Sequence, residues 1–353
     1  MRARFHSEGT MAFLHKTPRI TPPPEGRTGV LLINLGTPDD TGYFSVRRYL
    51  SEFLSDRRVI ESPPLIWQPI LQGIILTKRP FASGANYARI WDRDENASPL
   101  RVYTRRQAEG LAARLKADGV PVEWGMRYGR PSVAKALESL MDQGCDRIVS
   151  IALYPQYSAT TTATANDQLF RALMRLRRQP AVLTVPSFPD HPAFIRALET
   201  SVQDTLAGLT FKPQQIVASF HGLPKTCIEK GDTYRDECER TIAGLRTALG
   251  LSEAQMPLTF QSRFGPLEWI QPYTAPFVKA LPSQGITKIA VIMPGFMTDC
   301  IETLDEIGNE LREEFMEAGG EEFALVPCLN DSKGAIDLLE ELSRSALAGF
   351  QRG

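Results

Sequence analysis

A single histidine is the residue of this chain best placed for acid–base or metal chemistry. His221 ends an apolar run that predicts a buried strand, and Gly222 follows it directly. Imidazole titrates near neutral pH, so a histidine at such a strand end can accept a proton or bind a metal ion. The other histidines are less suitably placed, with His6 and His15 near the N-terminus and His191 in a turn. A structural role for His221 is the alternative, and its neighbours must decide between the two.

A group of carboxylates follows a later strand-like run. Glu302 and Glu306 are spaced four residues apart, so on a helix they share one face. Thr298 and Asp299 come just before them, where either could cap the helix. Such acidic spacing also occurs on solvated helix faces. Because the group follows the strand-end turn Pro294–Gly295, the pattern favours a site for a hard or borderline cation.

Strands and helices alternate along the chain in a way that places these residues at strand ends. The expected strands are Val30–Leu35, Val122–Tyr128, Ile148–Tyr154, Val182–Ser187, Ile216–His221, Leu258–Ser262, Ile289–Met293 and Ala324–Pro327. Amphipathic patterns lie between them, including a helix expected over 302–318. This alternation predicts α/β architecture with parallel sheets and right-handed crossovers, in which ligands bind beyond the carboxyl ends of the strands.

The expected strands fall into two groups of four, which predicts two similar domains. We expect a disordered tail over 1–27, a first domain over 28–188 and a second over 189–330, with the seam in a proline-rich turn near 188–190. The first domain carries a long insertion over about 38–100. Its apolar part, 63–79, is too short for a bilayer span, which takes about 20 apolar residues. A core helix is one reading; we expect an apolar lip over a ligand instead.

Composition excludes several classes of protein. Lys and Arg number 40 and Asp and Glu 41, so nothing favours nucleic acid as a partner. The chain has five cysteines and no CxxC pair, which is typical of a reduced, cytoplasmic protein rather than a disulfide framework. The N-terminal tail lacks the apolar segment of a secretory signal. No GxSxG, HExxH or GxxxxGK[ST] motif competes with the strand-end residues.

At this point the sequence resembles the ferrochelatase family. The segments that carry the resemblance are Leu32–Pro38, Tyr154–Ser158, Ile216–Pro224, Lys230–Tyr234, Gln261–Pro266 and Glu302–Leu304. The likeness extends from about Thr28 to the C-terminus, and the run Ile216–Pro224 is long and specific. It implies two doubly wound, Rossmann-like chelatase-type domains with a porphyrin cleft between them. It also implies that the last helix, within 331–353, packs back on the first domain.

The resemblance implies a lyase that inserts ferrous iron into protoporphyrin IX to form protohaem, the terminal step of haem biosynthesis. His221 and Glu302 match the family's metal-binding and catalytic pair, and Asp299 and Glu306 match its acidic path. The positions that match porphyrin-binding residues are Arg127, Tyr128, Phe296 and Trp269 in the cleft and Arg79, Tyr87 and Ser98 near the propionates. Peripheral contact of 63–79 with the inner membrane is a further expectation.

Departures from the family pattern refine these expectations. Ala159 stands where relatives with an iron–sulfur cluster place a ligand cysteine, and a cysteine-rich C-terminal extension is missing. We therefore predict no cluster and no required cofactor, with Fe²⁺ acting as a substrate. Leu35 stands where coproporphyrin-using relatives carry tyrosine, which favours protoporphyrin. Cys300 replaces a histidine found in some relatives, so a third imidazole is not expected at the site.

Three other functions remain open from the residues. A chelatase for another tetrapyrrole would bind a macrocycle with more carboxylates and so would need a more basic cleft, against which the apolar insertion argues. A non-catalytic haem-binding or haem-transfer protein would need an axial ligand but no acidic helix face, so Glu302 and Glu306 count against it. A metal-dependent hydrolase is disfavoured because His221 is the lone strand-end histidine.

Overall fold

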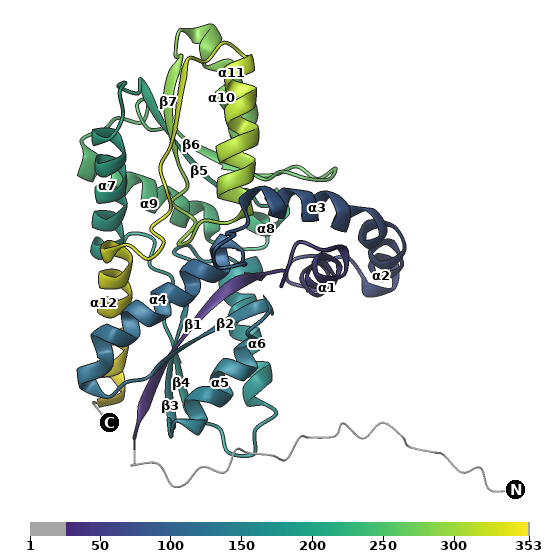
Figure 1. Ribbon diagram of the computed structural model, residues 1–353, viewed down its shortest axis with the longest axis vertical. Coiled ribbons are helices and arrows are strands. Elements are labelled where there is room, and N and C mark those ends of the chain that lie inside the picture. Colours follow the sequence, from purple (N-terminus) through teal and green to yellow (C-terminus); the bar gives the residue numbers. More distant parts are fainter. Residues whose placement is uncertain (1–25, 352–353) are drawn as a thin grey trace, which may run out of the picture.

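Two parallel sheets of four strands each form the framework of the protein (Figure 1). The computed structural model describes residues 26–351, so most of the expected tail 1–27, with His6 and His15, lies outside the described residues. The strands are β1 Thr28–Thr37, β2 Val122–Gly129, β3 Arg147–Ala152, β4 Ala181–Thr184, β5 Gln215–His221, β6 Leu258–Gln261, β7 Lys288–Ile292 and β8 Glu322–Leu325. The order is β2-β1-β3-β4 in the first sheet and β6-β5-β7-β8 in the second.

The two halves therefore repeat one topology, and the expected doubly wound α/β fold is confirmed. Each predicted strand is present, with ends shifted by a few residues. The largest difference is at β4, which ends at Thr184 rather than Ser187. Pro186 cannot donate to a strand ladder, which explains the early end of β4.

Helices cover both faces of each sheet. They are α1 Tyr43–Leu54, α2 Pro64–Ile70, α3 Leu76–Ile90, α4 Pro99–Leu115, α5 Val133–Asp142, α6 Thr164–Leu173, α7 Pro192–Ala207, α8 Lys225–Glu229, α9 Tyr234–Leu249, α10 Thr274–Ala280, α11 Arg312–Glu317 and α12 Lys333–Gln351. Three π-helical segments join them, η1 Leu71–Ile75, η3 Ala159–Ala163 and η5 Glu302–Leu311, with short 3₁₀ turns at η2 Lys116–Asp118 and η4 Pro282–Gln284.

Three apolar clusters hold these layers together. One lies between the first sheet and α5 and α6, and another lies between the second sheet and α10, η5 and α11. The largest is shared, because it joins Val30 and Leu32 of β1 to Ala218 and Phe220 of β5 through helices of both halves. The halves are thus packed against each other by burial of apolar side chains, the main stabilising force in folding.

The last helix, α12, bridges the two halves. It packs against α4 and β3 of the first half, and equally against α7 of the second. Figure 1 shows α12 beside α4 and below α7. The expectation that the C-terminal residues 331–353 return to the first domain therefore describes only one side of this helix.

The insertion projects to one side of the molecule as the helices α1, α2 and α3 (Figure 1). Its inner face is packed, since Leu71 and Leu76 are buried against α1 and Tyr128. Its outer face is apolar and exposed: Leu65, Ile66 and Ile74 are 92%, 63% and 60% exposed. Segment 63–79 is therefore helical, with one packed face and one exposed apolar face. Among residues 26–351, none of the helices is both long and apolar enough to cross a membrane.

Candidate active site

The predicted catalytic residues meet at the topological switch point of the second sheet. β5 and β7 are neighbours in this sheet, and the chain leaves them toward opposite sides, to β6 and to β8. In open α/β sheets such a point leaves a crevice at the carboxyl ends, where ligands bind. His221 is the last residue of β5, and the chain after β7 leads directly to Glu302 at the start of η5.

His221 is held by its backbone and by an aromatic neighbour. Its Nδ1 lies 2.6 Å from the carbonyl oxygen of Gly222, which leaves the other ring nitrogen, Nε2, outside this contact. The Trp269 ring lies 6.4 Å from the imidazole. A Cβ at position 222 would come within 2.8 Å of the Gln261 carbonyl, so the sharp exit from β5 requires glycine there.

The second carboxylate of the pair, Glu306, is fixed by β6. Ser262 donates to it twice, from its N–H and from its hydroxyl, each at 2.6 Å. Gln261, which pairs with His221 across β5 and β6, donates to Glu306 at 3.3 Å and to the Glu302 carbonyl at 2.9 Å. One residue of β6 therefore ties the histidine strand to the acidic segment.

The charges of both His221 and Glu302 act on Glu306. Burial raises the pKa of Glu306, and the charge of Glu302 raises it further. The Ser262 hydrogen bonds and the positive charge of His221 oppose this shift, and the net direction is upward. A carboxyl group whose pKa is raised toward neutrality, beside a histidine, can exchange protons with it.

The acidic residues lie on a π-helix, which the sequence did not reveal. We expected an α-helix over 302–318, but η5 is π-helical from Glu302 to Leu311 and α-helical geometry begins at Arg312. A four-residue spacing brings carboxylates together in either helix, so the pattern cannot tell them apart. π-Helical segments are uncommon and are often found at functional sites.

Asp299 is a brace rather than an open carboxylate. It accepts hydrogen bonds from the Thr303 hydroxyl at 2.9 Å and from the Asn330 amide at 2.6 Å, one on each oxygen. Asn330 in turn accepts the Asp299 N–H at 2.8 Å. We expected the side chain of Thr298 or Asp299 to cap the helix, but neither accepts a backbone N–H at the start of η5. The Thr298 hydroxyl instead accepts a hydrogen bond from the Asn34 amide of β1.

Arg127 and Tyr128 lie in a closed polar network instead of facing an open cleft. Both side chains are buried at the end of β2, and both bind the carboxylate of Asp56, Tyr128 at 2.8 Å. Thr164 completes the network by accepting from Arg127 at 2.6 Å and by donating to Asp56. The sequence reasoning missed Asp56, because nothing local marks it: its partners are far away along the chain.

Tyr87 and Ser98 are buried within the first half. Tyr87 is buried on α3 with Tyr49. Burial raises its pKa, and the charge of Glu302 adds to the shift. Ser98 caps α4 by accepting the Arg101 N–H at 3.3 Å.

The remaining two cleft candidates lie where the halves meet. Trp269 is buried beside His221, and its indole N–H has no hydrogen-bond partner among the described residues. Phe296 is half-buried and packs against the cluster formed by Leu100, Met126 and Cys300, so it touches both halves. A buried donor without a partner is costly in a closed protein, which favours a ligand near Trp269.

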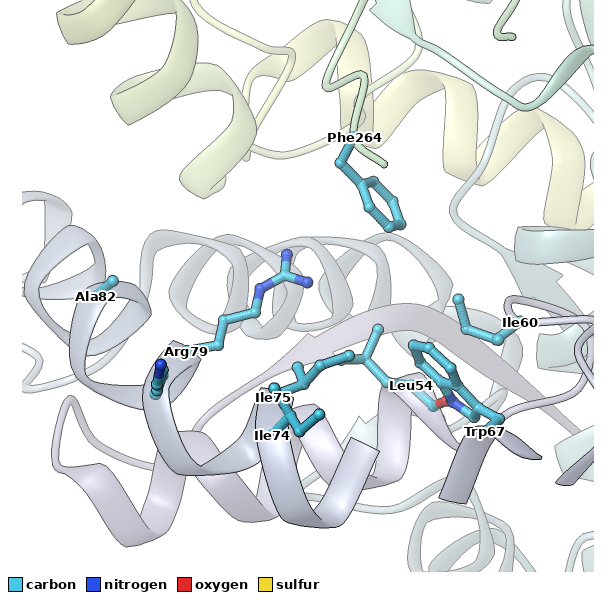
Figure 2. A pocket seen from close by; sticks show the side chains of 9 residues that line it. Leu54, Ile60, Trp67, Ile74, Ile75, Arg79, Ala82 and Phe264 are labelled. Atoms are coloured by element: carbon cyan, nitrogen blue, oxygen red, sulfur yellow. The ribbon is translucent and has the colours of Figure 1, made fainter. Parts of the chain in front are cut away.

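An apolar pocket opens between the insertion and the second half. It has a volume of about 430 Å³, within the range typical of ligand sites. Its lining consists of Leu54, Ile60, Trp67, Ile74, Ile75, Lys78, Arg79, Ala82 and Phe264. Figure 2 shows Phe264 pointing from the second half toward Arg79 on α3. The Arg79 guanidinium lies 5.8 Å from the centroid of that ring, so one side of this largely apolar pocket carries a positive charge.

No preformed metal cage accompanies these residues. Within 26–351, no three or more His, Cys, Asp or Glu side chains are grouped to hold a metal ion. Tight structural sites for divalent metals use four or more ligands.

The fold is of the chelatase type, with two doubly wound halves. The fold is similar to that of SirB from Bacillus subtilis with Fe3+, at a TM-score of 0.53 and 11% identity, covering 92% of this chain and 97% of that one. Such a likeness shows the fold alone.

The family follows from sequence. The Ferrochelatase family model matches residues 27–347. The chain is 94% identical over 343 residues to a ferrochelatase of Gluconobacter oxydans, covering 97% of this chain and 100% of that protein. It is 56% identical over 326 residues to a ferrochelatase of Brucella anthropi, covering 92% and 93%. The chain belongs to the ferrochelatase family.

Proposed function

We propose that this chain inserts ferrous iron into protoporphyrin IX to form protohaem, with His221 and Glu302 as the central pair of the site. The reaction itself follows from membership of the ferrochelatase family. The observation that carries the residue roles is the convergence of His221, Glu302 and Glu306 at the β5–β7 switch point.

The proton chemistry falls to His221. A free porphyrin keeps two of its ring nitrogens protonated, and both protons must leave as the metal enters. An imidazole whose pKa lies near neutrality can accept them in turn. His221 is partly exposed at the strand end and has its Nδ1 engaged by Gly222, which leaves Nε2 as the accepting atom.

The carboxylates handle the metal ion and pass protons on. Oxygen ligands bind Fe²⁺ less tightly than thiolates, so Glu302 and Glu306 can replace its water and still release it. Glu306 is held by Ser262 and Gln261, and the charge of Glu302 acts both on Glu306 and on Tyr87 of the first half. Asp299 supports them as a positioning residue, because its hydrogen bonds fix the turn that begins η5.

The porphyrin occupies the space between insertion and second half. Apolar side chains such as Ile75 and Phe264 accept the ring faces and exclude water, and Arg79 answers a propionate by a charge-assisted hydrogen bond. Trp269, which lies between this region and His221, offers its free indole N–H. Arg127 and Tyr128 do not contact the porphyrin in this proposal; they bind Asp56 and so hold the end of β2 against the segment that follows α1.

Two further properties belong to the proposal. The exposed apolar face of α2 and η1, with Leu65, Ile66 and Ile74 beside Lys78, supports peripheral contact with an anionic membrane surface. The second is the absence of an iron–sulfur cluster, which rests on Ala159 in place of a ligand cysteine.

Anaerobic insertion of Fe²⁺ into protoporphyrin and coproporphyrin, measured side by side, tests the function. We expect turnover with protoporphyrin in the wild type, and a loss of at least about a hundredfold for His221→Ala, as for other acid–base groups. Glu302→Gln should lose turnover similarly but still quench porphyrin fluorescence on binding. His191→Ala is the matched control, since His191 caps α7 outside the site and should leave turnover unchanged.

Near wild-type turnover in His221→Ala would remove that residue from the mechanism. Loss of porphyrin binding in Glu302→Gln, with iron handling intact, would make Glu302 a structural residue. Faster turnover of coproporphyrin would refute the inference from Leu35, which packs beside the buried cluster of the insertion.

A further inference from the structure

Asp305 is a buried carboxylate on η5 of the second half, and its counter-charge comes from Arg89 in the insertion of the first half. The Asp305 side chain is only 2% exposed, and Arg89 of α3 binds it at 2.7 Å. The same guanidinium nitrogen reaches Glu310, one turn further along η5, at 3.0 Å. Asn309 donates to the other Asp305 oxygen at 3.1 Å. Arg89 therefore clasps the π-helix at two points.

Burial makes this contact demanding. A carboxylate removed from water is strongly disfavoured unless a cation and hydrogen bonds satisfy it. Among residues 26–351, Arg89 is the one cation within salt-bridge distance of Asp305. Because Asp305 immediately precedes Glu306 in the chain and lies three residues after Glu302, its direction fixes how η5 is rotated and hence where both glutamates point.

The helix that supplies Arg89 also forms the wall of the pocket. α3 runs from Leu76 to Ile90, with Arg79 facing Phe264 near its start and Arg89 meeting η5 at its end. Ten residues of helix separate the two arginines, which is about 15 Å along the axis. Figure 1 shows α3 reaching from the projecting insertion to the lower end of the helical segment formed by η5 and α11.

We propose that Arg89 is a positioning residue for metal insertion: it locks η5 so that Glu302 and Glu306 face His221, and through α3 it couples this orientation to the porphyrin pocket. The inference rests on the proposed roles of Glu302 and Glu306. It assigns no contact with substrate to Arg89, whose side chain is engaged by Asp305 and Glu310.

Arg89→Met tests the proposal, because it removes the charge and keeps much of the length. We expect kcat to fall about 10- to 100-fold, the loss typical of a displaced catalytic group. The Kd for protoporphyrin, from fluorescence quenching, should stay within about twofold, since Arg79 and the pocket are untouched. Arg89→Lys should recover part of the rate. Arg105→Met is the matched control, because Arg105 also binds two carboxylates, Glu95 and Glu109, but within the first half.

A second variant separates positioning from mere stability. Arg89→Met combined with Asp305→Asn no longer buries an unpaired charge, so Tm should return toward the wild type while kcat stays low. Recovery of kcat together with Tm would overturn the proposal, as would wild-type kcat in Arg89→Met. Glu302→Gln measured in parallel distinguishes the failures. If it is inactive and Arg89→Met is normal, this inference alone fails; if it turns over normally, the proposed site fails and takes the inference with it.

Discussion

Replacement of Asp56 by alanine should destabilise the protein more than replacement of a carboxylate in one of the exposed ion pairs of the protein. Asp56 lies just after α1 and is 3% exposed, and its Arg127 partner is 6% exposed. The carboxylate binds Arg127, Tyr128 and Thr164 through one oxygen and the Arg58 N–H at 2.8 Å through the other. Alanine would leave a buried guanidinium without a counter-charge.

The expected loss is about 3–5 kcal/mol, the cost of removing one partner from a buried ion pair. That is a large share of a total stability of roughly 5–15 kcal/mol. Burial disfavours the charged form of Asp56, but the hydrogen bonds and the Arg127 charge outweigh it and hold its pKa below the ordinary value. A lowered carboxyl pKa gives stability that is complete above the unfolded pKa of about 3.9 and is lost only as pH falls through the folded value. The full difference should therefore be present at pH 7.

Urea denaturation at pH 7 measures the loss, with far-UV circular dichroism and tryptophan fluorescence as probes. Coincident transitions would justify two-state analysis. Asp167→Ala is the matched control, because Asp167 also forms an ion pair with an arginine, Arg58, at 2.7 Å. Both side chains of this pair are partly exposed. Such pairs contribute about 0–1 kcal/mol. If Asp56→Ala cost no more than Asp167→Ala, the reasoning from buried charge would be refuted.

Three other outcomes are expected. Ser262→Ala removes a hydroxyl donor that lowers the pKa of Glu306. That pKa should therefore rise further, and the acid limb of the pH–rate profile should move to higher pH. An acid limb that does not move would show that Glu306 is not the group that titrates there. Ile74→Ser should cost at most about 0.5 kcal/mol in urea denaturation and should weaken binding to anionic liposomes, whereas Leu76→Ser, at a fully buried position, should cost several, about 2–5 kcal/mol. Equal losses would mean that the exposed face is core. Anaerobically purified protein should contain no acid-labile sulfide, and stoichiometric sulfide would contradict the interpretation of Ala159.

The strands and the strand-end residues were predictable because the signals are local. Runs such as Ile216–His221 are apolar throughout, as expected of parallel strands covered on both faces, and the change to glycine and proline marks where each one ends. Parallel strands bring their carboxyl ends to one edge, so His221 and Glu302 could be placed near each other before any coordinates were known.

The parts that could not be predicted depend on contacts between distant residues. Asp56 and Arg89 look like ordinary charged residues of an insertion until their partners, Arg127 and Asp305, are placed against them. The packing of the insertion likewise depends on distant contacts, because Leu71 and Leu76 are buried against α1 and Tyr128.

The bridging position of α12 also affects how the chain folds as it is made. Leu338, Leu339 and Leu342 share an apolar cluster with Val30 and Leu32 of β1, so the last helix to leave the ribosome covers part of the first strand. At about 5–20 residues per second, translation leaves that surface incompletely covered for roughly 15–60 s. Pairings this distant in sequence form slowly, and exposed apolar surface promotes aggregation in the meantime. A premature stop before α12 would therefore uncover the interior of both halves.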